Sequence, residues 1–518
     1  MFNMEDELKK ANRLIITILL VLSSAVTLCG FSTFRNETGE ENANIISGKT
    51  PIDTERSGAI WHRSFSEDTI SYNSVPVIRG QVIYVVNQNK LFELNKQGAI
   101  LRQMTLSANM NSVCNLYNQG DYLYIPLDGG RIQCIRCSDM RSVWVSEAFG
   151  GQSLSTVYYH QGYLYAGTSN TPAGKTTGIF YCLDASDGHT IWTYEDTETP
   201  GGYYWSGGIV KGNAIFFSGD NGILVSHSLL EDEVYDTWTL TETGKVRAGI
   251  TCDTESGALY TTSNDGRIHR IEVTENGKIQ TVLSKKMVSS AKTANCTSTP
   301  SIWKNRLYVG SMADGCGYIH VLNATTLEHH YSVSTGQFKE VKASPLVSTG
   351  YAAKGNNETV YIYFTCNALP GGIYMIKDSQ SATSASLQTL FVPDKKQFCI
   401  SSVAADTDGT LYYSNDSGNL FAVQGLISIK KPGNVKWKKK KGKWIWTFSF
   451  KKNEPEAQTL VYVRYNSGKW KKIGTTNSSK YRATLKNRKK IRIRLRNRKK
   501  NSNKKWVYSP YTKSYRIR

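Results

Sequence analysis

The stretch Gly178-Ile-Phe-Tyr-Cys-Leu-Asp-Ala-Ser-Asp-Gly-His-Thr-Ile-Trp192 decides the fold, because an earlier stretch of the same chain aligns with it without a gap. The earlier copy reads Gly130-Arg-Ile-Gln-Cys-Ile-Arg-Cys-Ser-Asp-Met-Arg-Ser-Val-Trp144. Each copy has a short apolar run, a polar turn and a second run that ends on Trp. Such self-similarity is the mark of a repeat architecture, so we expect further copies along the chain.

Eight short apolar runs between residues 82 and 413 carry an aromatic side chain near their third position. The aromatic residues are Tyr84, Tyr124, Tyr165, Phe216, Tyr260, Tyr308, Tyr361 and Tyr412, and successive ones are 40 to 53 residues apart. That spacing accommodates four short strands and their turns, which make one blade of a β-propeller. The sequence therefore predicts an all-β fold with a propeller as its body.

Asp/Asn-Gly turns follow several of these runs and support a hairpin in each repeat. Such pairs tolerate the positive φ that tight hairpins require. Calcium-binding loops are the alternative interpretation, although each turn offers only one or two carboxylates. The turns are Asp128-Gly129-Gly130, Asp220-Asn221-Gly222, Asn264-Asp265-Gly266, Asp314-Gly315 and Asp416-Ser417-Gly418.

The two ends of the repeat region are expected to meet. The eighth repeat has runs for three strands (400–405, 409–413 and 419–423) and then ends. Gly58-Ala59-Ile60-Trp61 resembles an isolated fourth strand with its Trp. Pairing this strand with the last repeat would leave no unpaired edge between the first and last blades. We therefore predict eight blades, with seven as the alternative.

The best copy of the repeat, Leu183-Asp-Ala-Ser-Asp-Gly-His-Thr-Ile-Trp192, resembles the hallmark Ala-x-Asp-x-x-Thr-Gly-x-x-x-Trp of pyrroloquinoline-quinone-like (PQQ-like) propellers. The resemblance covers residues 58–425. It implies that Gly188 makes the turn and that Trp192 lies in the outermost strand and docks on the neighbouring blade. The family contains quinone-dependent dehydrogenases and also non-enzymatic scaffolds, including an outer-membrane-assembly lipoprotein.

No catalytic, cofactor or metal residue can be assigned. The dehydrogenases of this family often stack the quinone on a pair of adjacent cysteines, and this chain has no such pair. A His-Glu-x-x-His motif, a Gly-x-Ser-x-Gly motif and a phosphate-binding glycine loop are also missing from the sequence. We therefore expect a non-catalytic binding or scaffold protein, with a quinone-dependent dehydrogenase of divergent site as the alternative.

Most cysteines of the body behave as small apolar fillers of the repeat. Cys134 and Cys182 share one repeat position, and Cys137 occupies the position of Ala185. Other repeats place Val321, Met375 and Ala422 at the first position and Ala324 at the second. A metal or redox function for Cys134-x-x-Cys137 is the alternative, but no second pair or His has matching spacing.

The N-terminus predicts export. Lys9, Lys10 and Arg13 precede an apolar run from Leu14 to Phe31, which is typical of a signal peptide or an uncleaved signal anchor at residues 1–31. Residues 32–57 would be a linker. Leu28 before Cys29 is bulkier than the residue that lipoprotein signals prefer there. The only membrane contact we expect is through this segment.

The C-terminal part differs sharply from the rest in charge. Residues 430–518 hold 31 Lys and Arg against two Glu, a net charge of +29, whereas residues 1–429 have a net charge of −8. Strand-like runs in this part include 491–496, in which Ile or Leu alternates with Arg. The pattern resembles a small fibronectin type III β-sandwich over residues 430–518, with a different small β-sandwich as the alternative.

This basic domain is expected to bind an anionic polymer or surface of the cell envelope, such as a wall polymer or an acidic polysaccharide. Because an exported protein is separated from most nucleic acid, we do not expect nucleic acid as the partner. The propeller is expected to bind a protein or glycan through loops on one face. Tyr203-Tyr204-Trp205 is either a contact cluster on that face or part of the core. The candidate anion-binding residues are Lys438, Lys439, Lys440, Lys441, Arg488, Lys489, Lys490, Arg492, Arg494, Arg496, Arg498, Lys499 and Lys500.

Overall fold

The computed structural model describes residues 44–517, apart from gaps at 55–56, 69, 111–113, 154, 171–176, 354–356, 426–429, 455–456, 489, 501–505 and 510. The predicted signal segment 1–31 lies outside the described residues. The chain divides between Gln424 and Gly425 into two compact units, each of which we describe by itself. Within the described residues there are strands and loops, and no helix there has the length and hydrophobicity needed to cross a membrane.

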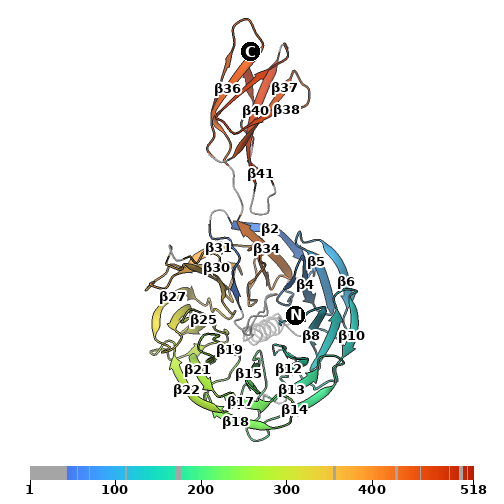
Figure 1. The fold of residues 1–518 in the computed structure, drawn as a ribbon, viewed down its shortest axis with the longest axis vertical. Helices are drawn as coiled ribbons and strands as arrows, with labels where there is room; N and C mark the ends of the chain where they lie inside the picture. The colour runs from blue at the N-terminus through green and yellow to red at the C-terminus, as the bar shows by residue number, and fades with distance from the viewer. Residues whose placement is uncertain are drawn as a thin grey trace, which may run out of the picture. The chain divides into compact units, whose positions relative to one another are not determined.

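Eight sheets of four or five strands make up the described part of the first unit and follow one another around a ring (Figure 1). The first four sheets contain β3 (Val77–Arg79), β4 (Val82–Asn87), β5 (Lys90–Asn95) and β6 (Ile100–Thr105); β7 (Tyr117–Gln119), β8 (Tyr122–Leu127), β9 (Arg131–Arg136) and β10 (Arg141–Val145); β11 (Tyr158–His160), β12 (Tyr163–Gly167), β13 (Phe180–Asp184) and β14 (Thr190–Tyr194); and β15 (Ile209–Lys211), β16 (Ala214–Ser218), β17 (Ile223–Ser228) and β18 (Val234–Thr239).

The other four sheets complete the ring and confirm the all-β propeller expected from the sequence. They contain β19 (Thr251–Cys252), β20 (Leu259–Ser263), β21 (Arg267–Val273) and β22 (Ile279–Lys286); β23 (Ala294–Asn295), β24 (Ser301–Trp303), β25 (Arg306–Ala313), β26 (Cys316–Asn323) and β27 (His329–Gln337); β28 (Leu346–Ser348), β29 (Val360–Thr365), β30 (Ile373–Asp378) and β31 (Gln388–Phe391), joined by β1 (Ile45–Ile46); and β32 (Ala404–Ala405), β33 (Leu411–Asn415) and β34 (Asn419–Gly425), joined by β2 (Ser57–Ser64).

The N-terminal strand β2 is the outermost strand of the last sheet, in the order β2-β34-β33-β32. The predicted closing strand around Trp61 is thereby confirmed. Part of the segment expected to be a linker is also built into the propeller, since β1 pairs in parallel with β28. Thr50 Oγ1 lies 2.7 Å from Tyr363 Oη in the same region. A two-residue strand has too little periodicity to be read from the sequence.

Strand register explains the shared repeat positions. Tyr124 lies opposite Cys134, and Tyr165 lies opposite Cys182. The same pairing joins Tyr308 to Val321, Tyr363 to Met375 and Tyr412 to Ala422. The cysteines therefore occupy the small apolar position that the alignment assigned to them. The aromatic residue of the seventh repeat is Tyr363, so the assignment to Tyr361 was wrong by one full alternation of the strand.

Tryptophan joins each of three blades to the next blade. The indole N–H of Trp144 donates to the carbonyl of Ala185 at 3.1 Å, that of Trp192 to Leu229 at 3.0 Å, and that of Trp61 to Lys96 at 2.9 Å. Each acceptor is the first residue after the third strand of the next blade. The docking predicted for Trp192 is therefore confirmed.

The glycine of the repeat is required by this same contact. Gly188 has φ +79°, and a Cβ at this position would come within 2.4 Å of the Trp144 ring. The indole of one blade therefore lies against the bare backbone of the next blade's turn. Any larger residue at 188 would combine backbone strain with a steric clash.

At one blade boundary Tyr331 takes the place of the tryptophan, and its hydrogen-bond acceptor is a buried carboxylate instead of a backbone carbonyl. Tyr331 lies opposite Val321, the place that Trp192 holds opposite Cys182. Its hydroxyl donates to Asp378 at 2.6 Å, and the Tyr308 hydroxyl donates to the same carboxylate at 2.8 Å. Arg306 supplies the counter-charge from 2.7 Å. All these side chains are buried, so this blade boundary is sealed by a polar network.

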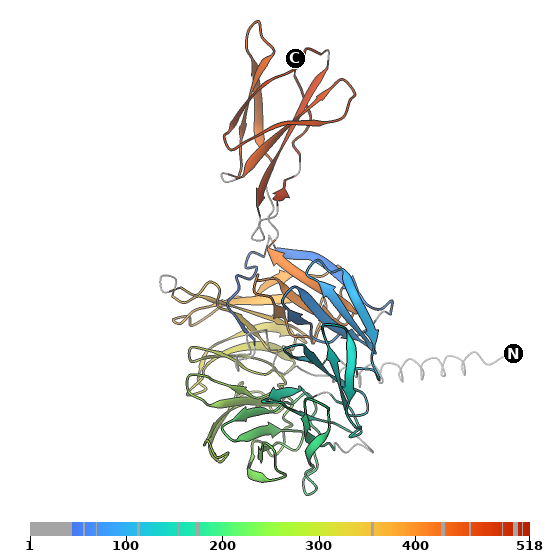
Figure 2. The same ribbon diagram turned by 45° about the vertical axis from the view of Figure 1, so that its right-hand side comes forward.

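The second unit, coloured orange to red in Figure 2, consists of two sheets around one buried cluster. One sheet has the order β35-β36-β39 and the other the order β38-β37-β40-β41, with β42 also paired to β40. Trp446 and Phe448 meet Val461 and Ile493 in the core. The strands are β35 (Gly433–Lys439), β36 (Ile445–Lys451), β37 (Gln458–Tyr465), β38 (Lys471–Thr476), β39 (Lys480–Thr484), β40 (Ile491–Lys500), β41 (Trp506–Tyr508) and β42 (Tyr515–Ile517).

The tryptophan contact between blades can be tested by truncation. We expect Trp192→Ala to lower the free energy of unfolding by about 3–5 kcal/mol, because it removes a fully packed aromatic ring. Trp238→Ala is the matched control, since Trp238 is 40% exposed on the outer strand β18, and should cost less than half as much. Chemical denaturation followed by circular dichroism measures both. Equal losses of unfolding free energy in the two variants would mean that the contact between blades stabilises the fold no more than an exposed tryptophan does.

Candidate functional site

Strand β40 presents a row of arginines on one face and apolar residues on the other. Ile491, Ile493 and Leu495 are at most 1% exposed and belong to the core of the second unit. Because side chains alternate along a strand, Arg492, Arg494, Arg496 and Arg498 share the opposite face. The alternation expected from the sequence is confirmed here.

Aromatic rings hold these arginines in place. Arg494 lies 3.7 Å from the centre of the Tyr511 ring and 4.4 Å from that of Trp470. Arg496 lies 4.2 Å from the Tyr508 ring, and Arg498 lies 3.9 Å from the Trp506 ring. The stacking fixes the guanidinium planes through cation–π attraction. Sequence reasoning missed these aromatic partners because they come from other segments of the chain.

Arg464 belongs to the same face and was also missed. It lies directly opposite Arg492 across the β37–β40 pair, and its guanidinium is 5.0 Å from the centre of the Trp470 ring. Leu460, Tyr462 and Arg464 occupy every second position of β37 and therefore share one face of the strand. This period of two is the signal that could have revealed Arg464. Adding Arg464 makes the basic face continuous over two neighbouring strands.

The second unit has almost no negative charge to neutralise this face. Glu454 is its only acidic side chain among the described residues, and one of its oxygens accepts a hydrogen bond from the backbone N–H of Lys430 at 3.2 Å. The Nε atoms of Arg464, Arg494 and Arg496 are buried without a hydrogen-bond partner. Arginine is most stable when its N–H groups bind an oxyanion. The face is therefore chemically suited to an anionic ligand.

A groove of about 820 Å³ opens at one end of the basic face. Its lining carries four cationic side chains, two amides and one hydroxyl. The lining residues are Arg464, Asn466, Ser467, Asn487, Arg488, Lys490 and Arg492.

The remaining predicted residues are distributed over two places. Lys438 and Lys439 end β35 of the three-stranded sheet, and Lys440 and Lys441 follow them in an exposed turn. Lys439 Nζ lies 3.7 Å from the centre of the Trp444 ring. Lys499 also belongs to β40, but strand alternation places it on the face opposite the arginine row. Lys489 and the side chain of Lys500 lie outside the described part of the chain.

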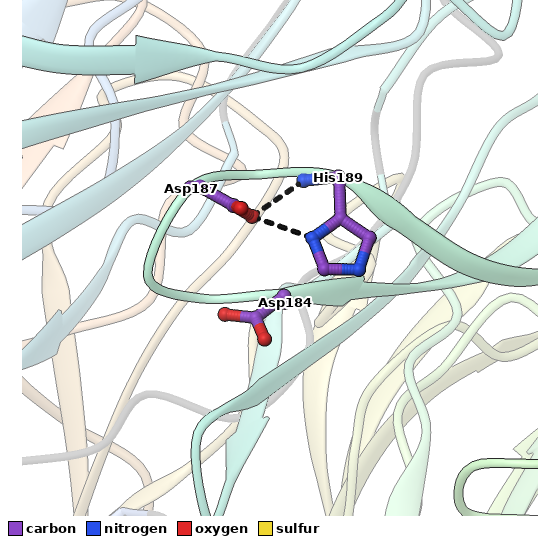
Figure 3. Close-up of side chains that lie close together, drawn as sticks. All are labelled: Asp184, Asp187 and His189. Carbon is purple, nitrogen blue, oxygen red and sulfur yellow. Dashed lines mark hydrogen bonds and ion pairs between the residues drawn. The ribbon is translucent and has the colours of Figure 1, made fainter.

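Among its described residues, the propeller contains one group of possible metal ligands, Asp184, Asp187 and His189 (Figure 3). Asp187 accepts a hydrogen bond from the backbone N–H of His189 at 3.0 Å and lies 2.7 Å from its ring Nδ1. Asp184 accepts from the Ser186 N–H at 2.7 Å. These bonds shape the β13–β14 turn against which Trp144 packs, so the repeat fold by itself accounts for the residues.

Of the two roles expected for Tyr203-Tyr204-Trp205, the structure supports the core and not the exposed contact cluster. Tyr203 is 3% exposed and Trp205 is fully buried. Tyr204 is half-buried, with Arg247 4.6 Å from the centre of its ring. The loop before β15 turns these rings inward because burying large aromatic surface is favourable. The cluster contributes to packing.

Comparisons with known proteins agree with the propeller fold of the first unit. A family model described as outer membrane protein assembly factor BamB matches residues 50–194. Among solved structures, BamB from Moraxella catarrhalis shares 12% identity at a TM-score of 0.52, covering 71% of this chain and 99% of its own. The body of the chain is a PQQ-like β-propeller. No curated protein sequence matches the chain.

Enzymes share this PQQ-like fold too. The quinohemoprotein alcohol dehydrogenase ADHIIG from Pseudomonas putida HK5 has 11% identity at a TM-score of 0.56, with 76% of this chain and 82% of its own covered. A europium-containing methanol dehydrogenase has 13% identity at a TM-score of 0.54, with 75% of this chain and 89% of its own covered. At such identities the likeness establishes the fold alone, so function must be argued from the site.

The Cys134-x-x-Cys137 pair of the PQQ-like propeller is buried. Burial raises the pKa of Cys134 to about 12 and also raises that of Cys137. Metal binding and redox exchange both require the thiolate, which is scarce at neutral pH for such groups. This environment favours the filler interpretation over the metal or redox interpretation.

Thiol labelling tests this interpretation. At pH 8 we expect iodoacetamide to modify Cys316, which is partly exposed, while Cys134 and Cys182 react only after denaturation. Burial raises the pKa of Cys182 to about 12 as well, so both access and thiolate content are low. Mass spectrometry of peptides reports each site separately. Rapid labelling of Cys134 in the native protein would contradict the filler role.

Proposed function

We propose that this chain is an exported, non-catalytic scaffold whose propeller binds another protein and whose basic C-terminal unit holds an anionic polymer of the cell envelope. The observation that carries the proposal is the arginine face of β37 and β40, which has one described acidic residue in its unit. A net charge of +29 over residues 430–518 has no counterpart within the unit.

Electrostatics gives the second unit its function. Its exposed lysines, among them Lys438 and Lys440, are mobile point charges that attract a polyanion over about one Debye length, roughly 10 Å. The stacked arginines add fixed donor forks that suit phosphate and carboxylate groups. Long-range attraction and short-range hydrogen bonding thus act on the same class of ligand.

The propeller presents exposed apolar side chains on neighbouring loops of one face. Phe338 is 75% exposed, Leu369 56%, Ile70 51% and Phe398 39%. Each lies in a segment that follows the second or fourth strand of a sheet. These segments therefore leave the strands at the same face of the ring.

Backbone hydrogen bonds place these segments side by side. The N–H of Asn367 donates to the carbonyl of Glu340 at 2.8 Å, which joins the Leu369 loop to the Phe338 loop. The N–H of Asp416 donates to Phe398 at 2.9 Å, and that of Ser71 donates to Asp416 at 2.9 Å. Exposed apolar surface of this kind marks protein interaction sites. We assign this face to a protein partner with apolar side chains.

The quinone-dependent dehydrogenase is the alternative, because alcohol and methanol dehydrogenases have the same fold. The scaffold role is supported by the family model that matches residues 50–194, whose description is an assembly factor. It is also supported by the exposed apolar loops, which suit a protein surface better than a small substrate.

Polymer binding tests the function of the basic unit. The full chain should bind polygalacturonate, and its affinity should fall at least about tenfold between about 0.1 M and about 1 M NaCl, because the screening length shrinks from about 10 Å to about 3 Å. Titration calorimetry measures the affinity. A chain with Lys438, Lys439, Lys440 and Lys441 replaced by Gln should bind more weakly at low salt. Affinity that ignores salt would refute the electrostatic function.

Site-specific photo-crosslinking tests the propeller face. A photo-reactive amino acid at Phe338 or Leu369 should form a discrete protein adduct in cells that make the chain. The control is the same amino acid at Leu283, which is 42% exposed on the outer strand β22. If the same crosslinked proteins appeared at all three positions, the propeller face would bind proteins no more specifically than the outer strand does.

A further inference from the structure

The groove of the second unit is built between two segments of chain that are hydrogen-bonded to each other. The turn after β37 supplies Asn466 and Ser467, and the segment before β40 supplies Asn487, Arg488 and Lys490. The N–H of Asn466 donates to the carbonyl of Lys490 at 2.7 Å, and the Asn466 side chain accepts from the Lys490 N–H at 3.3 Å. The two walls therefore have a fixed spacing without any ligand.

Like charges are held together along this groove. Arg464 and Arg492 are directly opposite each other in the β37–β40 register. Like charges at opposed positions destabilise a strand pair. Arg488 and Lys490 add two further positive charges to the same groove. The arrangement does not stabilise the fold by itself, whereas an anion bound in the groove would attract all of these positive side chains.

Arg464 is partly buried and lies against an aromatic ring instead of extending into solvent. Its guanidinium lies 5.0 Å from the centre of the Trp470 ring, and Arg494 lies 4.4 Å from the same ring. The Nε atom of Arg464 is buried and has no hydrogen-bond partner. A buried N–H without an acceptor is costly, and an oxyanion in the groove is the kind of acceptor that would satisfy it.

The placement of the donors on two walls favours phosphate over carboxylate. The tetrahedral oxygens of a phosphate can accept hydrogen bonds from both walls, whereas the two oxygens of a carboxylate lie in one plane and pair well with a single guanidinium fork. Asn466, Asn487 and Ser467 supply neutral groups that suit hydroxyls of the units between phosphates. A volume of about 820 Å³ holds more than one phosphate, so a segment of polymer fits.

We propose that this groove is a specific site for a phosphodiester polymer with hydroxylated linking units. The site rests on the proposed function of the basic unit and narrows its ligand from polyanions in general to one class. The positive charges outside the groove act as a nonspecific field, and the groove supplies the preference for phosphate.

Binding of the full chain to a glycerol-phosphate oligomer tests the site, with polygalacturonate of equal charge as the comparison. At about 0.15 M NaCl we expect the phosphate oligomer to bind at least about tenfold more tightly. The double variant Arg464→Gln/Arg492→Gln should lose this preference. The matched control Lys438→Gln/Lys440→Gln removes the same charge outside the groove and should keep it.

Thermal unfolding shows whether the variants fold. Because Arg464→Gln/Arg492→Gln removes a like-charge pair, its midpoint without ligand should equal or exceed that of the unmodified chain. Equal weakening by both double variants would overturn the site and leave the general electrostatic function standing. Failure of the unmodified chain to bind either polymer would refute that function itself. Vesicles of phosphatidylglycerol that bind in a groove-dependent way, while the oligomer does not, would assign the site to a membrane instead.

Discussion

The indole N–H of one blade donating to a backbone carbonyl of the next is the contact that organises the propeller. It fixes the outer strand of one sheet to the end of the third strand of its neighbour, as at Trp192 and Leu229. Tyr165 donates to the same carbonyl from 3.2 Å, so one acceptor ties together two strands of the preceding blade. Because each blade contacts mainly its neighbours, this contact fixes how adjacent blades lie against each other at the boundaries where it occurs.

The same geometry leaves the loops of one face available for recognition. The carbonyls that accept from the indoles lie directly after the third strands, whereas Phe338 and Leu369 lie in loops that follow the fourth and second strands. The exposed apolar loops are therefore separate from the turns that carry the acceptors. Where Tyr331 and Asp378 replace the tryptophan and the carbonyl, the hydrogen bond also forms at the end of a third strand. The contacts between blades and the proposed recognition surface therefore lie in different loops.

In the second unit, the single strand β40 contributes both to the core and to the basic face. Ile491, Ile493 and Leu495 close its core, and the arginines between them form the basic face. Stacking on Trp470, Tyr508 and Tyr511 holds the arginines side by side, with no carboxylate partner among the described residues. The lining of the groove at one end of this face contains four cationic side chains and no carboxylate.

The sequence by itself determined the features that repeat or alternate locally: the propeller, the closing strand at Trp61, the filler position of Cys134 and the alternation along residues 491–496. Each is a periodic pattern within one stretch of chain, so a single sequence can reveal it. Tertiary structure alone decided the burial of Trp205, the shift of the seventh aromatic to Tyr363 and the meeting of Arg464 with Arg492. These depend on cross-strand register and on how loops fold back, and a change of one residue in register moves a side chain to the other face of the sheet.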